Sequence, residues 1–366
     1  MSTQQIPVLV LAGFLGSGKT TLLNHLLRAS RGTRIGAIVN DFGSIEIDVM
    51  TVAGQLGDST VSLGNGCLCC AVDASELDVF LEKLTRPAAR LDVIVIEASG
   101  LAEPQELIRM ILASENERIV YGGLVEVVDA AEFDATRERH PELDRHLGIA
   151  DLIVLNKADR VDDAAGQLLR ERIAGLADGA AVIPATYGRV DPELLFECRP
   201  RGERVGQLSF EDLYEDDHGH DGHGGHLHSE HDGHLHAAYE TVSFTSAEPL
   251  HPRRLLDFLD SRPQGLYRIK GFVDFGEADS RNRYSVHSVG RFLRFCPEPW
   301  PCSVERQTQL VLIGAGIDTG ALLEVLGTAR VTGPQDAPEE HTMWGVLRYV
   351  PAPEQPGEQE PDDFMS

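Results

Sequence analysis

The sequence contains no run of eighteen or more apolar residues, so we expect no segment to span a membrane. Its first twenty residues lack the basic n-region and small-residue cleavage site of a signal peptide, and their apolar run leads directly into a glycine-rich motif. Basic residues are few: 32 Lys and Arg stand against 58 Asp and Glu, a formal net charge of −26. Such a chain repels phosphate backbones, which argues against nucleic acid as its main partner. We therefore expect a cytoplasmic protein that partners neither membranes nor nucleic acid.

The chain is long enough for two domains, with 366 residues of which 42% are hydrophobic. Its first half holds short runs rich in Val and Ile, separated by helix-length segments. Continuous rather than alternating hydrophobicity indicates strands buried on both faces, which is typical of a parallel sheet in an α/β domain. The runs are Val8–Ala12, Ile35–Val39, Val93–Ile96, Leu124–Val128, Leu152–Leu155 and Ala181–Pro184.

Four segments follow from changes in composition. We expect a P-loop α/β domain over 1–200, a flexible linker over 201–238, a smaller α+β domain over 239–350 and a disordered acidic tail over 351–366. In the smaller domain Tyr239–Phe244, Leu266–Phe275, Tyr284–Val289 and Gln309–Ile313 are predicted strands, and Pro252–Leu259 is a predicted helix. A further helix should begin after the N-cap Asp318 and end at Gly327.

The segment Gly13–Thr20 reads GFLGSGKT, follows the first apolar run and opens an amphipathic stretch. It matches G-x-x-x-x-G-K-[ST] with the strand before it and the helix after it that a phosphate-binding loop requires. The backbone N–H groups would cradle phosphate oxygens, Lys19 would reach the β- and γ-phosphates, and the Thr20 hydroxyl would ligate Mg²⁺. The nucleotide-binding residues predicted in this segment are Gly13, Gly16, Ser17, Gly18, Lys19, Thr20 and Thr21.

The choice of base is predicted by Asn156-Lys157-Ala158-Asp159, directly after the run Leu152–Leu155. A buried Asp159 carboxylate would accept hydrogen bonds from guanine N1 and N2, whereas adenine has no matching donors and would leave the charge unpaired. Asn156 would support the loop, and the Lys157 stem would cover a face of the ring. The tetrapeptide alone is weak, but after a strand and downstream of a P-loop it favours GTP over ATP.

Three of the six cysteines crowd into Cys67-Leu68-Cys69-Cys70, after Gly64-Asn65-Gly66. Neighbouring cysteines are poor disulfide partners, and three thiols within four residues can converge on one soft or borderline cation. Zinc, cobalt(II) and copper(I) are all chemically possible. Because zinc normally takes four ligands, this loop leaves a position open, which suits transfer of the metal. The alternative is buried thiols that only fill space.

A weaker metal signal comes from the eight histidines between His218 and His236, where GHLH occurs twice. Imidazoles on a flexible chain bind zinc, nickel or copper with little geometric selectivity, which favours metal loading or buffering over a solubilising linker.

Together these residues resemble the CobW-type P-loop GTPases, a family that includes zinc metallochaperones. The resemblance rests on GFLGSGKT, the C-x-C-C loop, EASGLAEP at 97–104, NKAD, the histidine-rich linker and Ile269-Lys-Gly-Phe272, and it covers nearly the whole chain. It implies that Asn40–Asp48 and Glu97–Pro104 are two nucleotide switches with the cysteine loop between them. Family members usually carry Glu where this chain has Asp41 and Gly where it has Glu46; Asp41 can still ligate Mg²⁺ or the transported metal, with a reach one methylene shorter.

We therefore predict a GTP- and Mg²⁺-dependent GTPase that binds Zn²⁺ or Co²⁺ at Cys67, Cys69 and Cys70, with Asp41 as a further candidate ligand, and delivers it to a client metalloprotein. Lys19, Thr20 and Glu97 would carry catalysis, Glu97 holding Mg²⁺ through water. No general base is evident, so intrinsic turnover should be slow and a client should accelerate it. The alternatives are a non-enzymatic metal store and a P-loop kinase or NTPase with structural cysteines.

Overall fold

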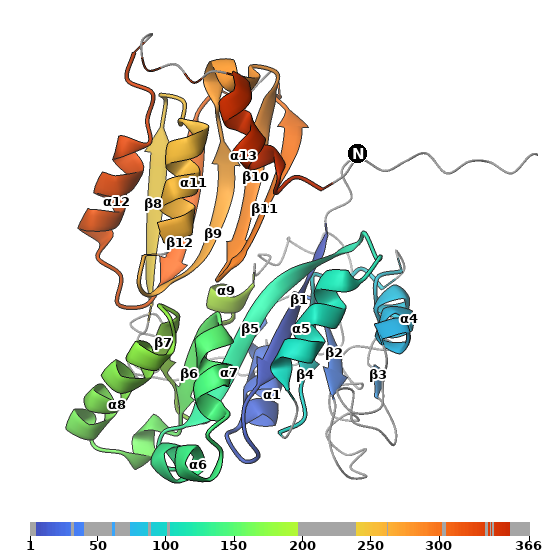
Figure 1. Cartoon of the computed structure of the whole chain (residues 1–366). Helices are drawn as coiled ribbons and strands as arrows, with labels where there is room; N and C mark the ends of the chain where they lie inside the picture. Colours follow the sequence, from blue (N-terminus) through green and yellow to red (C-terminus); the bar gives the residue numbers. More distant parts are fainter. Residues whose placement is uncertain are drawn as a thin grey trace, which may run out of the picture.

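The structure is a computed structural model (Figure 1). The part of the chain that it describes is organised around two sheets. One is a seven-stranded parallel sheet in the order β3-β2-β4-β1-β5-β6-β7, and the other is a five-stranded antiparallel sheet in the order β11-β10-β9-β12-β8. The described residues are 5–30, 33–39, 61–62, 74–86, 89–100, 103–196, 239–261, 263–301, 305–333, 336, 338 and 340–351. None of the helices in these ranges is both long and apolar enough to cross a membrane.

The parallel sheet is built from the apolar runs of the first half of the chain. Its strands are β1 (Ile6–Ala12), β2 (Ile35–Val39), β3 (Val61–Ser62), β4 (Val93–Glu97), β5 (Ile119–Asp129), β6 (Leu152–Asn156) and β7 (Ala181–Pro184). The helices between them are α1 (Lys19–Ala29), α4 (Ala74–Leu84), α5 (Pro104–Ala113), α6 (Phe133–Arg139), α7 (Leu143–Ile149), α8 (Asp163–Leu176) and α9 (Pro192–Leu195). The predicted α/β class with a parallel sheet is confirmed, with β3 added at one edge and β5 extended well beyond the predicted run.

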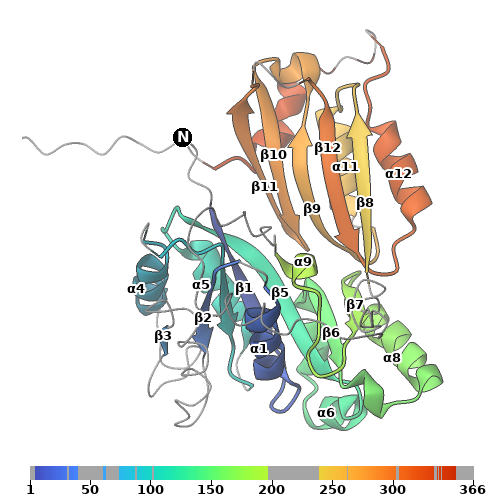
Figure 2. The same cartoon turned by 180° about the vertical axis from the view of Figure 1, so that it is seen from behind.

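Helices cover both faces of this sheet, which is why its strands are apolar on both sides. Along β1, Val8 and Val10 pack in the core beneath α4, α5 and α7, whereas Leu9 and Leu11 pack against α1. Figure 1 shows α5 and α7 on the near face, and Figure 2 shows α1 on the far one. Strand β1 therefore lies at the centre of the domain, and the loop that follows it is anchored on both sides.

The second sheet is antiparallel and carries helices on one face (Figures 1 and 2). Its strands are β8 (Glu240–Ser246), β9 (Leu266–Val273), β10 (Asn282–Val289), β11 (Phe292–Pro299) and β12 (Thr308–Gly314), and its helices are α11 (Pro252–Ser261), α12 (Thr319–Thr328) and α13 (Trp344–Leu347). The predicted smaller α+β domain is confirmed in class. Strand β11 was not predicted, because Pro297 and Pro299 interrupt its pattern; prolines are tolerated there since β11 is an edge strand.

The predicted start of helix α12 is confirmed, and its predicted end is wrong. Asp318 is its N-cap and accepts a 3.0 Å hydrogen bond from the Ala321 N–H. The predicted stop at Gly327 is wrong, because the helix continues to Thr328 and Ala329 is the C-cap. A carboxyl-terminal glycine ends a helix by adopting a left-handed conformation, and Gly327 is not among the residues with positive φ.

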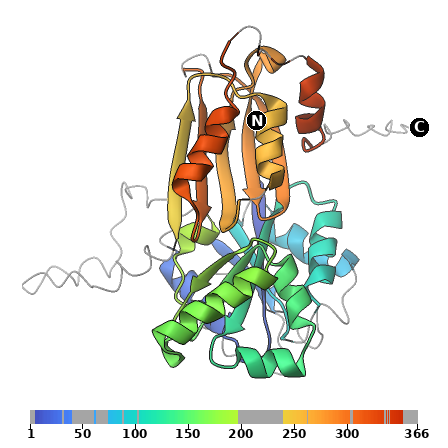
Figure 3. The same ribbon diagram turned by 60° about the vertical axis from the view of Figure 1, so that its left-hand side comes forward.

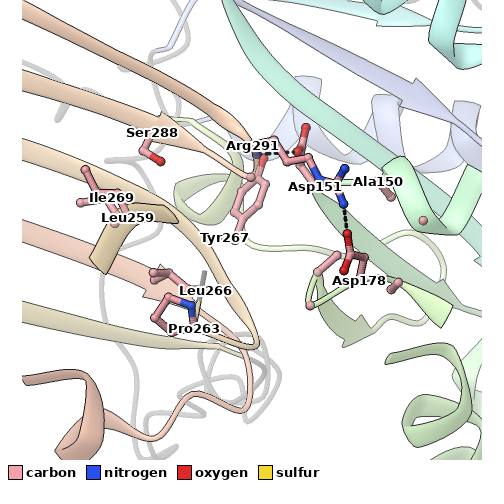
Figure 4. Close-up of a pocket in the computed structure, with 15 residues that line it drawn as sticks. Ala150, Asp151, Asp178, Leu259, Pro263, Leu266, Tyr267, Ile269, Ser288 and Arg291 are labelled. Atoms are coloured by element: carbon pink, nitrogen blue, oxygen red, sulfur yellow. Dashed lines mark hydrogen bonds and ion pairs between the residues drawn. The ribbon is translucent and has the colours of Figure 1, made fainter. Parts of the chain in front are cut away.

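The two sheets stack end to end (Figure 3) and meet at Asp151, which directly precedes β6. The Asp151 carboxylate accepts hydrogen bonds from Tyr121 Oη at 2.6 Å, from the Leu124 N–H at 2.8 Å and from the Arg291 N–H at 3.2 Å. The first two donors belong to β5 and the third to the turn between β10 and β11. Figure 4 shows Arg291 reaching from the antiparallel sheet to Asp151 and Asp178 beside the ring of Tyr267. Asp151 is thus a buried carboxylate that contacts both halves of the described chain, beside other hydrogen bonds between them such as Arg268 to the Leu195 carbonyl.

Candidate nucleotide and metal site

The carboxyl ends of the parallel strands meet at one edge of the sheet, where open α/β folds bind ligands. The residues that follow β1, β4 and β6 at this edge include the three predicted nucleotide segments. The polar side chains found there belong to segments that are far apart in sequence but adjacent in the fold, since β4 and β1 are neighbours and β5 separates β1 from β6.

The loop between β1 and α1 has the backbone of a phosphate cradle. Gly13, Gly16 and Gly18 all have positive φ, at 140°, 81° and 105°. A Cβ on Gly13 would lie 2.3 Å from the Val127 carbonyl oxygen, and one on Gly18 would lie 2.2 Å from Asn156 Nδ2. Glycine is therefore required at both positions by conformation and by space.

Lys19 closes this loop from inside. Its Nζ donates to the Gly13 carbonyl at 2.8 Å and to the Phe14 carbonyl at 3.4 Å, and the side chain is buried. The next residue, Thr20, donates its hydroxyl to Glu97 Oε1 at 2.6 Å. Glu97 ends β4 and is itself buried. The predicted Mg²⁺ ligand Thr20 and the acid predicted to hold Mg²⁺ through water therefore lie within one hydrogen bond of each other.

Asn156 connects the base segment to the phosphate loop. It is buried at the end of β6, donates Nδ2 to the Ser17 carbonyl at 2.8 Å and accepts from the Gly188 N–H at 2.9 Å. Lys157 then crosses back over the loop, with Nζ 2.8 Å from the Gly16 carbonyl oxygen and 2.7 Å from Asp129 Oδ2. Both side chains therefore brace the loop. Support of the loop was expected of Asn156, whereas for Lys157 only the covering of the ring face by its stem was predicted.

The expectation that Asp159 is buried is wrong. The side chain is exposed on the 3₁₀ turn Ala158–Arg160, because the chain leaves the sheet after Asn156 and turns outward. Asp159 still lines the same pocket as the phosphate loop, so its carboxylate is available to a base that would itself shield it from solvent.

A pocket of about 490 Å³ brings most of the predicted residues together. Its predicted members are Gly16, Gly18, Lys19, Thr20, Thr21, Glu97, Asn156, Lys157 and Asp159. Gly13 and Ser17 lie in the loop but do not line this pocket. Leu15 of the predicted phosphate loop and Ala98 and Gly100 of the predicted second switch also line it. Arg160 and Tyr187 line it too and lie outside every predicted segment; the one signal for Arg160 was its position directly after Asn156–Asp159.

The proposed second switch contacts the phosphate loop directly. A Cβ on Gly100 would lie 2.8 Å from the Leu15 nitrogen and 3.0 Å from its Cα, so only glycine lets the two backbones approach this closely. Three residues on, the Glu103 carboxylate pairs with Arg145 on α7 at 2.5 Å. Within the segment Glu97–Pro104, Gly100 thus lies against the phosphate loop and Glu103 is bonded to α7.

Glu126 is a carboxylic acid inside the core that the sequence analysis missed. It lies on β5 opposite Ala12 and Ile153, is fully buried, and neither carboxyl oxygen has a hydrogen-bond partner among the described residues. Burial raises the pKa of Glu126 to about 8, while the nearby charge of Lys19 acts in the opposite direction. The carboxyl is therefore largely protonated at neutral pH. Its signal was a charged residue in the middle of the run Leu124–Val128.

The predicted transition-metal ligands Cys67, Cys69, Cys70 and Asp41 lie outside the described residues, as do the first switch over 40–48 and the histidine run. Within the ranges that the structure describes, no three His, Cys, Asp or Glu side chains are grouped so as to hold a metal ion. The one described cysteine that is free is Cys296, half-buried on β11.

The strand order, with the glycine loop after its central strand, places the chain among the P-loop NTPases, and the segment after β6 places it with those that bind GTP. Comparison with known proteins agrees with this class. Residues 7–184 match the family "CobW/HypB/UreG, nucleotide-binding domain", and residues 239–330 match "Cobalamin synthesis protein cobW C-terminal domain".

Among curated proteins, the chain is 33% identical to the "Zinc chaperone CobW" of Pseudomonas aeruginosa over 89% of this chain and 92% of that one. It is 34% identical to "Zinc-regulated GTPase metalloprotein activator 1" of Schizosaccharomyces pombe, over 51% and 47% of the two chains. Among solved structures, "Zn(II)-bound YjiA GTPase from E. coli" matches with 24% identity, 89% and 99% coverage and a TM-score of 0.42. The chain belongs to the CobW family of P-loop GTPases.

Proposed function

We propose that this GTPase is a metallochaperone that binds a transition metal, zinc before cobalt, at Cys67, Cys69 and Cys70 and delivers it to a client metalloprotein. The names of its relatives support zinc as the cargo and a metalloprotein as the client. Three thiolates suit zinc and leave a coordination position through which the ion can pass to another protein.

The observation that carries this proposal is the contact between Gly100 and the Leu15 backbone. It places the proposed second switch against the phosphate loop, so a change in the bound phosphates can move the switch. The cysteine loop lies between the two proposed switches in sequence, and a switch that moves on hydrolysis would alter how its thiols converge.

The described residues fit GTP and Mg²⁺. Backbone N–H groups of 13–20 and the Lys19 ammonium would hold the phosphates, and Asp159 would accept from the guanine edge. The oxygens of Thr20 and Glu97 suit Mg²⁺, which neutralises charge on the β- and γ-phosphates when bound. Phosphate oxygens would take over the Lys19 hydrogen bonds that now close the loop on the Gly13 and Phe14 carbonyls.

Slow intrinsic hydrolysis is consistent with the pocket. Its described lining includes two carboxylates, Glu97 bonded to Thr20 and Asp159 at the base end. Glu97 accepts the Thr20 hydroxyl and Asp159 lies at the base end, so neither is an evident general base for an attacking water. We therefore propose that client binding supplies or orients the missing group, which would tie metal release to the presence of the client.

The test is the metal affinity of the full chain with a GTP analogue, with GDP and without nucleotide, in competition with a chromogenic chelator. We expect the affinities with GTP analogue and GDP to differ by roughly 1–3 kcal/mol, about ten- to a hundredfold. Replacing Cys67, Cys69 and Cys70 by Ser should abolish this difference and leave GTP binding in place, while Cys296→Ser, outside the loop, is the matched control.

Equal affinities in the two nucleotide states would refute delivery under nucleotide control. If Lys19→Ala also left the rate of GTP hydrolysis to GDP and phosphate unchanged, the chain would be a metal store rather than a chaperone. Phosphate transfer to a small acceptor, insensitive to metal at the thiols, would instead assign it to the kinases.

A further inference from the structure

The turn that follows β7 carries an aromatic side chain in a conformation that aromatic residues rarely adopt. Tyr187 has φ 54° and Gly188 has φ 64°, and the Arg189 N–H donates to the Thr186 carbonyl at 3.1 Å to close the turn. Two central residues with positive φ are the pattern of a type I′ turn, whose first position is normally Asn, Asp or Gly. A bulky residue there is strained, and such strain is typical of functional sites.

The position of this turn is determined by its neighbours and not by the tyrosine ring. The Gly188 N–H donates to Asn156 Oδ1, and a Cβ on Gly188 would lie 2.7 Å from the Leu22 nitrogen. Just beyond it, a His25 ring nitrogen lies 2.9 Å from the Val190 carbonyl oxygen. Helix α1 and the base segment therefore hold the turn, and the Tyr187 side chain contributes little to its own placement.

Tyr187 is 69% exposed and lines the nucleotide pocket beside Asn156, Lys157 and Asp159. Stacking its ring against a flat apolar partner would remove apolar surface from water, which is favourable. The one large planar group that the proposed function brings to this end of the pocket is the purine base.

We propose that Tyr187 stacks on the guanine base, on the face that the Lys157 stem leaves uncovered, and so holds the nucleotide by its base. This inference rests on the proposed GTP site and adds a binding residue to it. The Lys157 ammonium is already fixed by Gly16 and Asp129, so its stem is available as one wall of a slot. Tyr187 is then the opposite wall, and the strain of its backbone is retained because the ring is needed there.

The test is calorimetric titration of the full chain with GDP and Mg²⁺, using variants that suit the turn but differ at the ring. Tyr187→Asn and Tyr187→Gly both fit positive φ and lack the ring, so the apoproteins should unfold close to the wild-type temperature. Their Kd for GDP should rise about tenfold or more, as expected for loss of an aromatic stack on a base. Tyr187→Phe keeps the face of the ring and should restore most of the affinity.

Two controls separate stacking from other effects. Inorganic tripolyphosphate has no base, so its affinity for the P-loop should not follow the Tyr187 series. Arg90→Gly removes a positive-φ side chain, at φ 49°, that does not line the pocket, and should leave GDP affinity unchanged. Wild-type affinity in Tyr187→Asn, or equal weakening of GDP and tripolyphosphate, would overturn the stacking role while the GTP site stands. Failure of the wild-type chain to bind GDP would instead remove the proposed function itself.

Discussion

The Thr20 hydroxyl and Glu97 Oε1 are joined by a 2.6 Å hydrogen bond that links the first turn of α1 to the last residue of β4. In a P-loop GTPase these two positions share one ion, because the hydroxyl ligates Mg²⁺ directly and the acid holds it through water. Their proximity in this fold supports the proposal that both residues would hold Mg²⁺.

Glu97→Gln tests this arrangement without removing the contact, since Gln can still accept from Thr20. Loss of the negative charge should raise the Mg²⁺ concentration needed for half-maximal GTP hydrolysis by about tenfold or more, which corresponds to roughly 1.4 kcal/mol. The measurement is hydrolysis rate against Mg²⁺ concentration. Glu106→Gln, an exposed acid on α5, is the matched control; an unchanged Mg²⁺ dependence in Glu97→Gln would remove Glu97 from the ion site.

Asp159→Asn should change which base the pocket prefers. The substitution removes a carboxylate acceptor for guanine N1 and N2 and should weaken GTP binding by at least ~2 kcal/mol. It should also improve binding of xanthosine triphosphate relative to GTP, because the new amide N–H can donate to the xanthine C2 carbonyl. Competition among GTP, XTP and ATP measures both effects. Equal affinity of the native chain for ATP and GTP would show that Asp159 does not select the base.

Deleting 218–236 should separate weak metal binding from the tight site. The segment holds eight histidines outside the proposed cysteine site, so its loss should lower the number of weakly bound zinc ions and leave the tight stoichiometry and GTP hydrolysis in place. Chelator competition over a range of zinc concentrations counts both classes. Replacing the eight histidines by Asn at constant length is the control, and loss of the tight site in that variant would make the histidines direct ligands.

The parallel sheet and the phosphate loop could be predicted because burial on both faces and a phosphate cradle each impose a pattern on consecutive residues. Features that depend on tertiary contacts could not be predicted in this way. The left-handed backbone of Tyr187 depends on contacts with α1 and Asn156, and the exposure of Asp159 depends on where the chain turns after β6. Glu126 is a charge within the otherwise apolar run Leu124–Val128, and that it is fully buried without a hydrogen-bond partner among the described residues depends on packing that the sequence does not show.

The interdomain contact predicts an unusual sensitivity at Gly290. This residue has φ 50°, and a Cβ there would lie 1.7 Å from Asp151 Oδ1, so Gly290→Ala should displace the carboxylate that joins the two sheets. Gly316→Ala is the control, because Gly316 also has positive φ, 68°, but nothing lies within 4 Å of its added Cβ. We expect about 1 kcal/mol lost at Gly316 and at least ~2 kcal/mol more at Gly290. Similar losses in urea unfolding would mean that the contact contributes little.

Glu126 predicts that stability decreases as pH rises through neutrality. Its pKa is about 8 in the folded protein and near its ordinary value of 4.5 in the unfolded chain, so between these values the folded state holds a proton that the unfolded state has lost. The free energy of unfolding should then fall by about 1.4 kcal/mol per pH unit across this window. The favourable contribution is complete below the unfolded pKa and is lost above the folded one.

Glu126→Gln should remove this slope, because the amide has the shape of the protonated acid and cannot ionise. Unfolding free energies of both proteins from pH 5 to pH 8.5 give a difference curve in which the wild type is progressively less stable than the variant toward high pH. The half-buried His25 and the buried His146, whose pKa values are lowered by desolvation, act with the opposite sign, but they are common to both proteins and cancel in the difference. A flat difference curve would show that Glu126 reaches solvent or a cationic partner when it ionises, and that its burial beneath the phosphate loop costs the folded state nothing.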